Sequence, residues 1–215
     1  SYRGIKLLYY RCFFVVVQVA ILWYVKRKYR KTFFTGDMEE KGRSKNMAKW
    51  LDNAIFYEIY PQSFLDTNGD GIGDFQGIIE KLDYIKELGC NAIWMNPCFA
   101  SPFGDAGYDV ADYYQAAPRY GTNADLKRLF NEVHKRNMHI LLDLVPGHTS
   151  VAHPWFKESC KADRNEFTDR YIWTDSTWGQ LENMGSLCGI SEREGSVIVN
   201  FFAHQPALNY GFYKK

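Results

Sequence analysis

Hydrophobic residues in the middle of the chain follow two alternating patterns. Three short apolar runs, each ending at or beside a proline, are typical of buried strands: residues 54–60, 92–97 and 139–145. Between them, residues 75–89 and 122–137 carry apolar side chains at every third or fourth position. This spacing puts the apolar side chains on one face and predicts two amphipathic helices.

The ends of both predicted helices carry the residues that helix ends favour. Gly89 suits the C-terminal cap of the first helix, and Thr122 or Asn123 suits the N-cap of the second. Three strands that alternate with two helices form a βαβαβ unit, and such units make parallel sheets with right-handed crossovers. The pattern therefore predicts an α/β fold over residues 47–145.

This alternation stops after Val145. Residues 146–215 contain many aromatic residues and turn formers but no clear amphipathic helix. A connection of that length inside a compact domain is usually functional or forms a small domain of its own. We therefore expect an inserted subdomain over residues 146–205 and a return of the chain over residues 206–215.

The first 46 residues differ in charge from the rest of the chain. They hold eleven Lys and Arg against three Asp and Glu, a net charge of +8, whereas residues 47–215 have a net charge of −7. Residues 12–25 are almost wholly apolar, but fourteen residues are fewer than the roughly 20 that span a bilayer. We interpret residues 1–46 as an extension outside the domain, with a membrane anchor over residues 7–31 as the alternative.

Cysteine usage and composition narrow the class of protein. The five cysteines match no zinc spacing and no regular disulfide framework, and the sequence has no N-x-Ser/Thr glycosylation site. We therefore expect reduced thiols in a cytoplasmic protein, with a membrane-anchored protein as the minority alternative. Basic and aromatic residues do not cluster in the acidic domain, so nothing in the sequence supports nucleic-acid binding.

Polar clusters follow each of the three predicted strands. DTNGDGIGD (66–74) comes after the first strand, SPFGDAGYD (101–109) after the second, and PGHTS (146–150) after the third. The carboxyl ends of parallel strands meet at one edge of a sheet, and that edge carries the site in parallel α/β folds. The three clusters together predict a functional site there.

The stretch DTNGDGIGD has the composition of a cation-binding loop. Its oxygen-bearing side chains match the first positions of an EF-hand, but Gly77 stands where a bidentate glutamate is needed and a strand precedes the loop. This argues against a calcium sensor, and the carboxylates would repel a phosphate. A static site for Ca²⁺ or Mg²⁺ remains, with a solvated acidic turn as the alternative. The predicted ligands are Asp66, Asn68, Asp70, Asp74 and the carbonyl of Ile72.

Four more residues are candidates because of where they stand. A carboxylate inside an apolar run, as Asp143 is, is costly unless it is paired or hydrogen-bonded, so we expect it in the site or bound to an arginine. His148 follows five residues later, and Asp105 and Tyr108 belong to the second cluster. Each is by itself more often a packing or loop residue. Their shared place at the strand ends makes them candidate site residues.

Five strings occur in the order and spacing of a known enzyme family: AIFYEIYPQSFLDTNGDGIGDFQGI, AIWMNPCFASP, DAGYDVADY, LLDLVPGHTS followed by HPWF, and QPALNY. Through them residues 48–215 resemble the N-terminal part of an α-amylase superfamily glycoside hydrolase, of the oligo-1,6-glucosidase and α-glucosidase branch. The resemblance implies a (β/α)8 TIM barrel, of which the chain holds about three of the eight strands. It also implies a small subdomain inserted after strand three.

The resemblance also implies roles for the candidate residues. Tyr108 would stack on the sugar in the cleavage subsite, and His148 would hydrogen-bond its hydroxyls. Asp143 would brace the catalytic centre, and Asp105 would recognise the non-reducing end. The first loop would hold Ca²⁺ or Mg²⁺, and the substrate would be an α-linked oligosaccharide or disaccharide.

Two residues depart from the family pattern. Gly147 stands where the pattern has asparagine, which puts any second calcium site in doubt. Ala207 stands where the glucosidase branch often has aspartate, which weakens the assignment of the linkage. The resemblance further implies that the catalytic nucleophile and the acid/base lie on later strands, beyond Lys215. We therefore expect the 215 residues to be an N-terminal fragment that is inactive alone.

Three alternatives remain from the sequence. An α-glucosyl transferase or isomerase of the same family, for example a trehalose-forming enzyme, would share every string above. A non-enzymatic, membrane-anchored heavy chain of an amino-acid transporter would use residues 7–31 as its anchor. A site built within this chain from the carboxylates of Asp105 and Asp143 is the third.

Overall fold

The computed structural model describes residues 48–175, 185–188 and 191–211. The chain divides into two compact units, Ser1–Leu51 and Asp52–Lys215. The predicted extension over residues 1–46 and the alternative anchor over residues 7–31 lie outside the described residues. Among the helices that are described, none is both long and apolar enough to cross a membrane.

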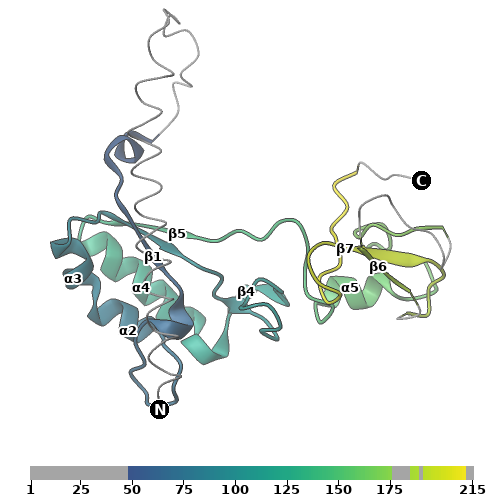
Figure 1. Cartoon of the computed structure of the whole chain (residues 1–215), viewed down its shortest axis with the longest axis horizontal. Coiled ribbons are helices and arrows are strands. Elements are labelled where there is room, and N and C mark those ends of the chain that lie inside the picture. The colour runs from purple at the N-terminus through teal and green to yellow at the C-terminus, as the bar shows by residue number, and fades with distance from the viewer. Residues whose placement is uncertain (1–47, 176–184, 189–190, 212–215) are drawn as a thin grey trace, which may run out of the picture. The chain divides into compact units, whose positions relative to one another are not determined.

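The second unit contains a three-stranded parallel sheet (Figure 1). It contains β1 (Phe56–Ile59), β2 (Ala92–Met95) and β5 (His139–Leu142), in the order β1-β2-β5. Both strand pairs are parallel. The three strands predicted from the apolar runs are thus present, and the predicted βαβαβ order is confirmed.

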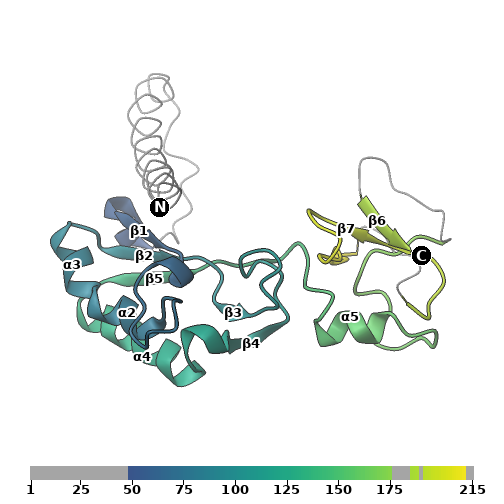
Figure 2. The same cartoon turned by 60° about the horizontal axis from the view of Figure 1, so that its bottom comes forward.

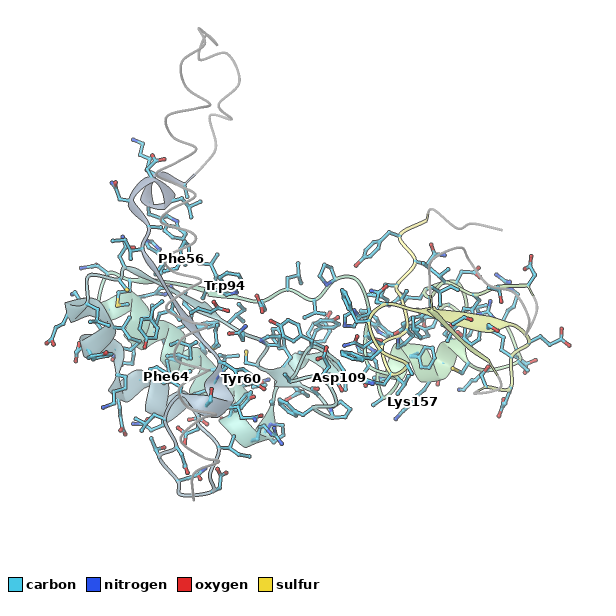
Figure 3. The ribbon with its side chains drawn as sticks, viewed as in Figure 1. Phe56, Tyr60, Phe64, Trp94, Asp109 and Lys157 are labelled. Atoms are coloured by element: carbon cyan, nitrogen blue, oxygen red, sulfur yellow. The ribbon has the colours of Figure 1, made fainter. Side chains whose placement is uncertain are left out.

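The register of the sheet separates two faces. Glu58, Trp94 and Leu141 are neighbours in one row across the strands, and the next row places Ile59 beside Met95. Because side chains alternate along a strand, these two rows point to opposite faces. Ile59 and Met95 are buried, whereas Trp94, which is labelled in Figure 3, belongs to the other row and is 41% exposed by its accessible surface.

Helices cover one face of the sheet. The first predicted helix is present as α2 (Phe75–Glu80) and α3 (Leu82–Glu87), which are separated at Lys81. The second is α4 (Asn123–Lys135), and all three lie on the same side of the sheet (Figure 2). Gly89 takes the left-handed conformation (φ 87°) just after α3, as predicted for a C-terminal cap.

Apolar residues from these helices and from the strands form the main core. Phe75, Ile78, Leu82 and Ile85 of the first helical segment are fully buried. They pack in one cluster with strand and α4 residues, among them Ile59, Ile93, Met95, Leu129 and Val133. The periodicity of apolar positions in the sequence therefore corresponds to the buried faces.

Shorter elements connect these parts. After β2 the chain forms an antiparallel pair, β3 (Phe99–Ala100) and β4 (Asp112–Ala116), with the second polar cluster between the two strands. Three 3₁₀ turns complete the segment up to β5: η1 (Lys49–Asn53), η2 (Pro61–Ser63) and η3 (Pro118–Tyr120). The hydrophobic pattern did not predict the β3–β4 pair, because β3 has only two residues.

Residues after β5 build a second, smaller apolar cluster. The elements are α5 (Pro154–Ser159) and an antiparallel pair of β6 (Gly185–Cys188) and β7 (Ser196–Val199). Phe156, Tyr171, Trp173 and Val197 are the buried members of the cluster. The sequence predicted an inserted subdomain over residues 146–205 without a clear amphipathic helix, and the six-residue α5 is too short to show a periodic pattern.

The chain then pairs back onto the segment that follows β5. His148 and Ala207 form an antiparallel bridge, and the Leu208 N–H donates to the Gly147 carbonyl. In the same region the Ser150 N–H donates to the Val110 carbonyl. These backbone bonds bring residues 205–208 to the second and third polar clusters.

Candidate functional site

Asn96 and Asp143 stand one residue beyond β2 and β5, at the carboxyl ends of the strands. Backbone pairing continues there, because the Asn96 N–H donates to the Ile59 carbonyl and the Asp143 N–H donates to the Met95 carbonyl. The alternation of side chains is therefore kept. Both side chains point from the same face of the sheet as Trp94.

Two aromatic donors hold the Asp143 carboxylate. Oδ1 accepts the indole N–H of Trp94 at 2.5 Å, and Oδ2 accepts the hydroxyl of Tyr108 at 2.9 Å. Within the described part of the chain these two groups, and no arginine, hydrogen-bond the carboxylate. These hydrogen bonds offset the desolvation free energy of a carboxylate placed in an apolar run.

Tyr108 connects the ends of two strands. Its hydroxyl accepts the Asn96 side-chain amide at 3.2 Å and donates to Asp143, so the phenol proton is directed at the carboxylate. Partial burial raises the pKa of the Tyr108 phenol; the Asn96 bond opposes this, and the bond and charge of Asp143 add to it. The hydroxyl therefore remains a donor at neutral pH.

His148 is buried, and both of its ring nitrogens have partners. Nε2 lies 3.2 Å from the Tyr108 carbonyl oxygen, and Nδ1 lies 3.2 Å from the Asn200 amide nitrogen. Since a carbonyl only accepts, this network assigns the proton to Nε2. Burial lowers the pKa of His148, against the raising effects of the Tyr108 carbonyl and the nearby Asp105 and Asp109 charges. The ring is therefore neutral at pH 7.

Asp105 is anchored from the far end of the described chain. Its Oδ2 accepts the side-chain amide of Gln205 at 2.7 Å, although the two residues are 100 positions apart. Gln205 is fully buried, and its Oε1 has no hydrogen-bond partner among the residues that the structure describes. Asp105 itself is half-buried.

The structure thus brings the four predicted residues into one connected group. Tyr108 contacts Asp143 through its side chain and His148 through its carbonyl, and Asp105 lies three residues before Tyr108 in the same loop. Sequence reasoning did not identify the residues that hold this group: Trp94, Asn96, Asn200, Phe201 and Gln205. Two signals were present for part of them, namely the strand alternation at Trp94 and Asn96 and the string that contains Gln205.

Phe201 adds an apolar surface beside this group. Its ring lies edge-on to the His148 ring, with centroids 5.8 Å apart, and its side chain is 78% exposed. Exposed aromatic rings next to hydrogen-bonding groups suit ligands that have apolar faces and polar edges. Sugars have this character.

The first loop, residues 66–74, folds around its own side chains. The Asp66 carboxylate accepts the backbone N–H groups of Asn68, Gly69 and Gly71. The Gly71 and Gly69 bonds are the main reason why the pKa of Asp66 is lowered. Asp70 in turn accepts the Ile72 N–H at 2.8 Å.

Asp74 has a different role from the other loop residues. Its Oδ1 accepts the Gly77 N–H at 2.7 Å and caps α2, and both of its oxygens contact the Thr67 hydroxyl. Among the described residues no group of three or more His, Cys, Asp and Glu is placed to hold a metal ion. The loop oxygens are engaged with backbone N–H groups instead. Binding of Ca²⁺ or Mg²⁺ by the predicted ligands therefore stays a prediction.

Gly147 and Ala207 depart from the family pattern, and the structure shows which residues surround each of them. A Cβ at Gly147 would lie 3.0 Å from the Asn200 amide nitrogen, which donates to the Gly147 carbonyl at 2.9 Å. Ala207 is buried in an apolar cluster with Ile172 and Ile198. An aspartate at this position would have to be accommodated in that apolar cluster, which is costly.

Residues 58–210 match the family described as alpha amylase, catalytic domain. That match covers most of the chain. The chain belongs to this family. The fold agrees, because its similar solved structures are α-amylase family enzymes and the described sheet is the parallel α/β start of such a barrel.

Relatives with known names are similar over the same part of the chain. Over 173 residues the chain is 44% identical to an oligo-1,6-glucosidase of Heyndrickxia coagulans, covering 76% of this chain and 31% of that protein. Over 170 residues it is 48% identical to a trehalose-6-phosphate hydrolase of Bacillus subtilis, covering 75% and 30%. The chain thus spans less than a third of the length of these relatives.

Solved structures give the same result. The trehalose-6-phosphate hydrolase of Bacillus licheniformis aligns with a TM-score of 0.67 at 41% identity, over 75% of this chain and 30% of that one. The trehalulose synthase MutB of Pseudomonas mesoacidophila aligns with a TM-score of 0.69 at 41% identity, over 76% and 31%. Both sequence identities support membership of the same family and not only a shared fold.

Proposed function

We propose that the protein acts in carbohydrate metabolism as a glycoside hydrolase that cleaves α-glucosidic bonds. The observation that carries this proposal is the connected group of Asp105, Tyr108, Asp143 and His148 at the strand ends. In a member of the alpha-amylase catalytic family, that edge of the sheet is where substrate is bound.

Each of the four side chains has a role in this proposal. The Tyr108 ring packs on the C–H face of the terminal glucosyl unit, and the free part of the Asp105 carboxylate accepts a hydroxyl at its non-reducing end. We place the neutral His148 ring beside the same glucosyl unit, because its Nε2–H donates to the Tyr108 carbonyl. Asp143, held by Trp94 and Tyr108, keeps the ring of Tyr108 in place.

The chemistry of bond cleavage needs two further carboxylates. Retaining glycosidases use one carboxylate as nucleophile and a second carboxyl group as acid and base, about 5 Å apart. Asp143 and Asp105 are already engaged by Trp94, Tyr108 and Gln205. We further propose, as the family resemblance implies, that the nucleophile and the acid/base lie outside the 215 residues, and we expect these residues to bind substrate without cleaving it.

Sugar binding can be measured directly on the chain. Titration with methyl α-D-glucopyranoside, followed by calorimetry or by amide shifts, should give saturable binding. Tyr108→Ala should weaken it about tenfold, because the stacking surface is lost. Tyr114→Ala is the matched control, since Tyr114 is 82% exposed and lies on β4. Equal affinity in both variants would contradict the assignment of Tyr108.

Turnover is tested on the full-length gene product. With isomaltose or maltose as substrate, proton NMR during the first minutes should show α-glucose as the initial product, as retention requires. An isomerised disaccharide in place of glucose would favour the second candidate, a transferase or isomerase. That candidate has support from the structural similarity to a trehalulose synthase.

A further inference from the structure

Asp109 is a buried carboxylate next to the proposed sugar-binding residues that no role above uses (Figure 3). It is 1% exposed, and three donors surround it. Oδ1 accepts the Ser101 hydroxyl at 2.8 Å and the Asp105 N–H at 3.1 Å, and Oδ2 accepts the Gly104 N–H at 2.9 Å. All three donors belong to the loop that leads to Asp109 itself.

That loop has an unfavourable backbone. Phe103 (φ 60°) and Ala106 (φ 52°) take the left-handed conformation, which costs free energy for residues other than glycine. Such conformations persist only where the surroundings hold them. The Phe103 ring packs against Arg119 and Tyr120, and its N–H donates to the Ser101 hydroxyl oxygen at 2.8 Å while that hydroxyl donates to Asp109.

Both of the proposed sugar-binding residues of the loop depend on this arrangement. The Asp105 N–H is bonded to Asp109, and the Asp105 carbonyl accepts the Tyr108 N–H at 2.8 Å. Asp105 can therefore offer its carboxylate to a ligand only while the loop keeps this path. Tyr108 directly precedes Asp109 in the chain, so the buried carboxylate also limits where the phenol ring can lie.

We propose that Asp109 is a positioning residue: its carboxylate folds the 101–109 loop and so places Asp105 and Tyr108 for the sugar. The assignment of a sugar to these two residues rests on the proposed function, whereas the folding of the loop does not. Asp109 acts through its neighbours and touches no substrate.

The chemistry of the side chain makes this specific to a carboxylate. A carboxylate offers two accepting oxygens, and here they serve three donors. An asparagine of the same shape has one accepting oxygen, and its NH₂ group would face one of the donors. With the amide oxygen in the Oδ1 position, the Gly104 N–H loses its acceptor.

The experiment is amide hydrogen exchange on the 215-residue chain with Asp109→Asn. We expect the Gly104 amide to exchange at least about tenfold faster than in the wild type, because a buried donor loses its partner. The amides of Asn96 and Ala117, which donate to Ile59 and Cys98 away from this carboxylate, should keep their rates. Because the asparagine amide can instead turn its NH₂ group toward the Asp105 N–H, unchanged exchange at both Gly104 and Asp105, or equal acceleration at all these amides, overturns the inference.

Ser101→Ala provides a second, milder variant in case the asparagine variant fails to fold. It removes the hydroxyl that links Phe103 to Asp109 but leaves the Oδ2 acceptor in place. The Phe103 amide should exchange about tenfold faster while the Gly104 amide keeps its rate. No change at Phe103, or loss of protection across the whole sheet, contradicts the loop arrangement.

Titration with methyl α-D-glucopyranoside gives a readout that a purely structural role would not move. In the wild type the sugar should shift the amide signals of Asp105 and Tyr108, and in Asp109→Asn the Asp105 shift should be lost although the sheet amides keep their protection. A sugar-induced Asp105 shift retained in Asp109→Asn overturns the positioning role. Absence of any shift in the wild type refutes the proposed sugar binding and leaves the exchange result to decide the folding of the loop.

Discussion

At the scale of single residues, the site is built from aromatic and amide groups that orient charges. Asp143 receives an indole N–H and a phenol, and both donors come from a strand end or loop that the sheet brings together. A carboxylate held by two directional donors is fixed in its orientation. This makes Tyr108 the residue on which the geometry of the group depends most.

Removing the Tyr108 hydroxyl should destabilise the chain measurably. In Tyr108→Phe the Asp143 Oδ2 and the Asn96 amide both lose a partner, which should lower the free energy of unfolding by about 1 kcal/mol. Urea unfolding followed by circular dichroism measures this difference. Tyr114→Phe, at an exposed position, should change it by much less, and equal effects would show that the bond contributes nothing.

The buried histidines predict a pH dependence of stability. Burial lowers the pKa of His148 and of His153 below the ordinary value near 6.5. As the pH falls, these histidines are protonated in the unfolded chain before they are protonated in the folded chain. Their contribution to the free energy of unfolding is therefore fully present above about pH 6.5 and is lost as the pH falls below it. The melting temperature should be lower at pH 5.5 than at pH 7.5.

A single variant tests how much His153 contributes to this pH dependence of stability. Its Nδ1 caps α5 by accepting the Trp155 N–H, and asparagine can supply the same acceptor. His153→Asn should therefore keep the helix cap but reduce the difference in melting temperature between pH 7.5 and pH 5.5. The same difference in both proteins would assign the pH dependence to other groups.

At the scale of elements, the helices carry their own start signals. Thr122 and Asp125 form a reciprocal capping box at the start of α4, with each side chain bonded to the backbone N–H of the other. The sequence predicted this N-cap at Thr122 or Asn123, and Thr122 is confirmed. Because α4 packs on the sheet through Leu129 and Val133, its cap contributes to the stability of the whole core.

Loss of this cap has a defined expected cost. Thr122→Ala should lower the free energy of unfolding by about 1 kcal/mol, since the Asp125 N–H loses its acceptor. Thr122→Ser is the control, because serine caps equally well and should stay within a few tenths of a kcal/mol of the wild type. Equal destabilisation by serine would point to the lost methyl group and not to the cap. Chemical denaturation measures both variants.

The first loop, residues 66–74, is the element that we predict to bind a cation. If Asp66, Asn68, Asp70, Ile72 and Asp74 bind Ca²⁺ or Mg²⁺, EDTA should lower the melting temperature, because the ion binds only the folded chain. Asp70→Ala should remove this sensitivity to EDTA. A melting temperature that EDTA leaves unchanged in the wild type would favour the solvated acidic turn. Scanning calorimetry with and without the chelator measures both.

At the scale of the whole molecule, the described sheet has one covered and one uncovered face. The helices cover the face of Ile59 and Met95, whereas Phe56, Trp94 and Leu141 on the other face are 38%, 41% and 39% exposed. Parallel sheets are normally covered on both faces. In a (β/α)8 barrel this second face points into the barrel and is closed by further strands.

The uncovered face should make the isolated 215-residue chain bind apolar probes. We expect enhanced fluorescence of a dye such as ANS and self-association that rises with concentration in sedimentation experiments. Trp94→Ala would interrupt the apolar row and should reduce dye binding. Dye fluorescence and sedimentation that match those of an ordinary monomeric domain would contradict this expectation.

The strands, the helices and their parallel arrangement could be predicted because they depend on local pattern. Period-two and period-3.6 spacing of apolar residues is read within a window of a few residues, and caps such as Thr122 act within one turn. The gathering of polar clusters at one edge also follows, because parallel strands share a carboxyl edge. Asp105, Tyr108, Asp143 and His148 were chosen as candidate site residues in this way.

Only the tertiary structure decided what holds these residues. The donors to Asp143 come from positions 35 and 49 residues away, and Asp105 is held by Gln205 from 100 residues away. It also decided that Asp74 caps α2 and that Asn200 fills the space beside Gly147. Hydrogen bonds need both partners at a set distance and direction, and a sequence states which partners exist but not which of them the folded chain brings within reach.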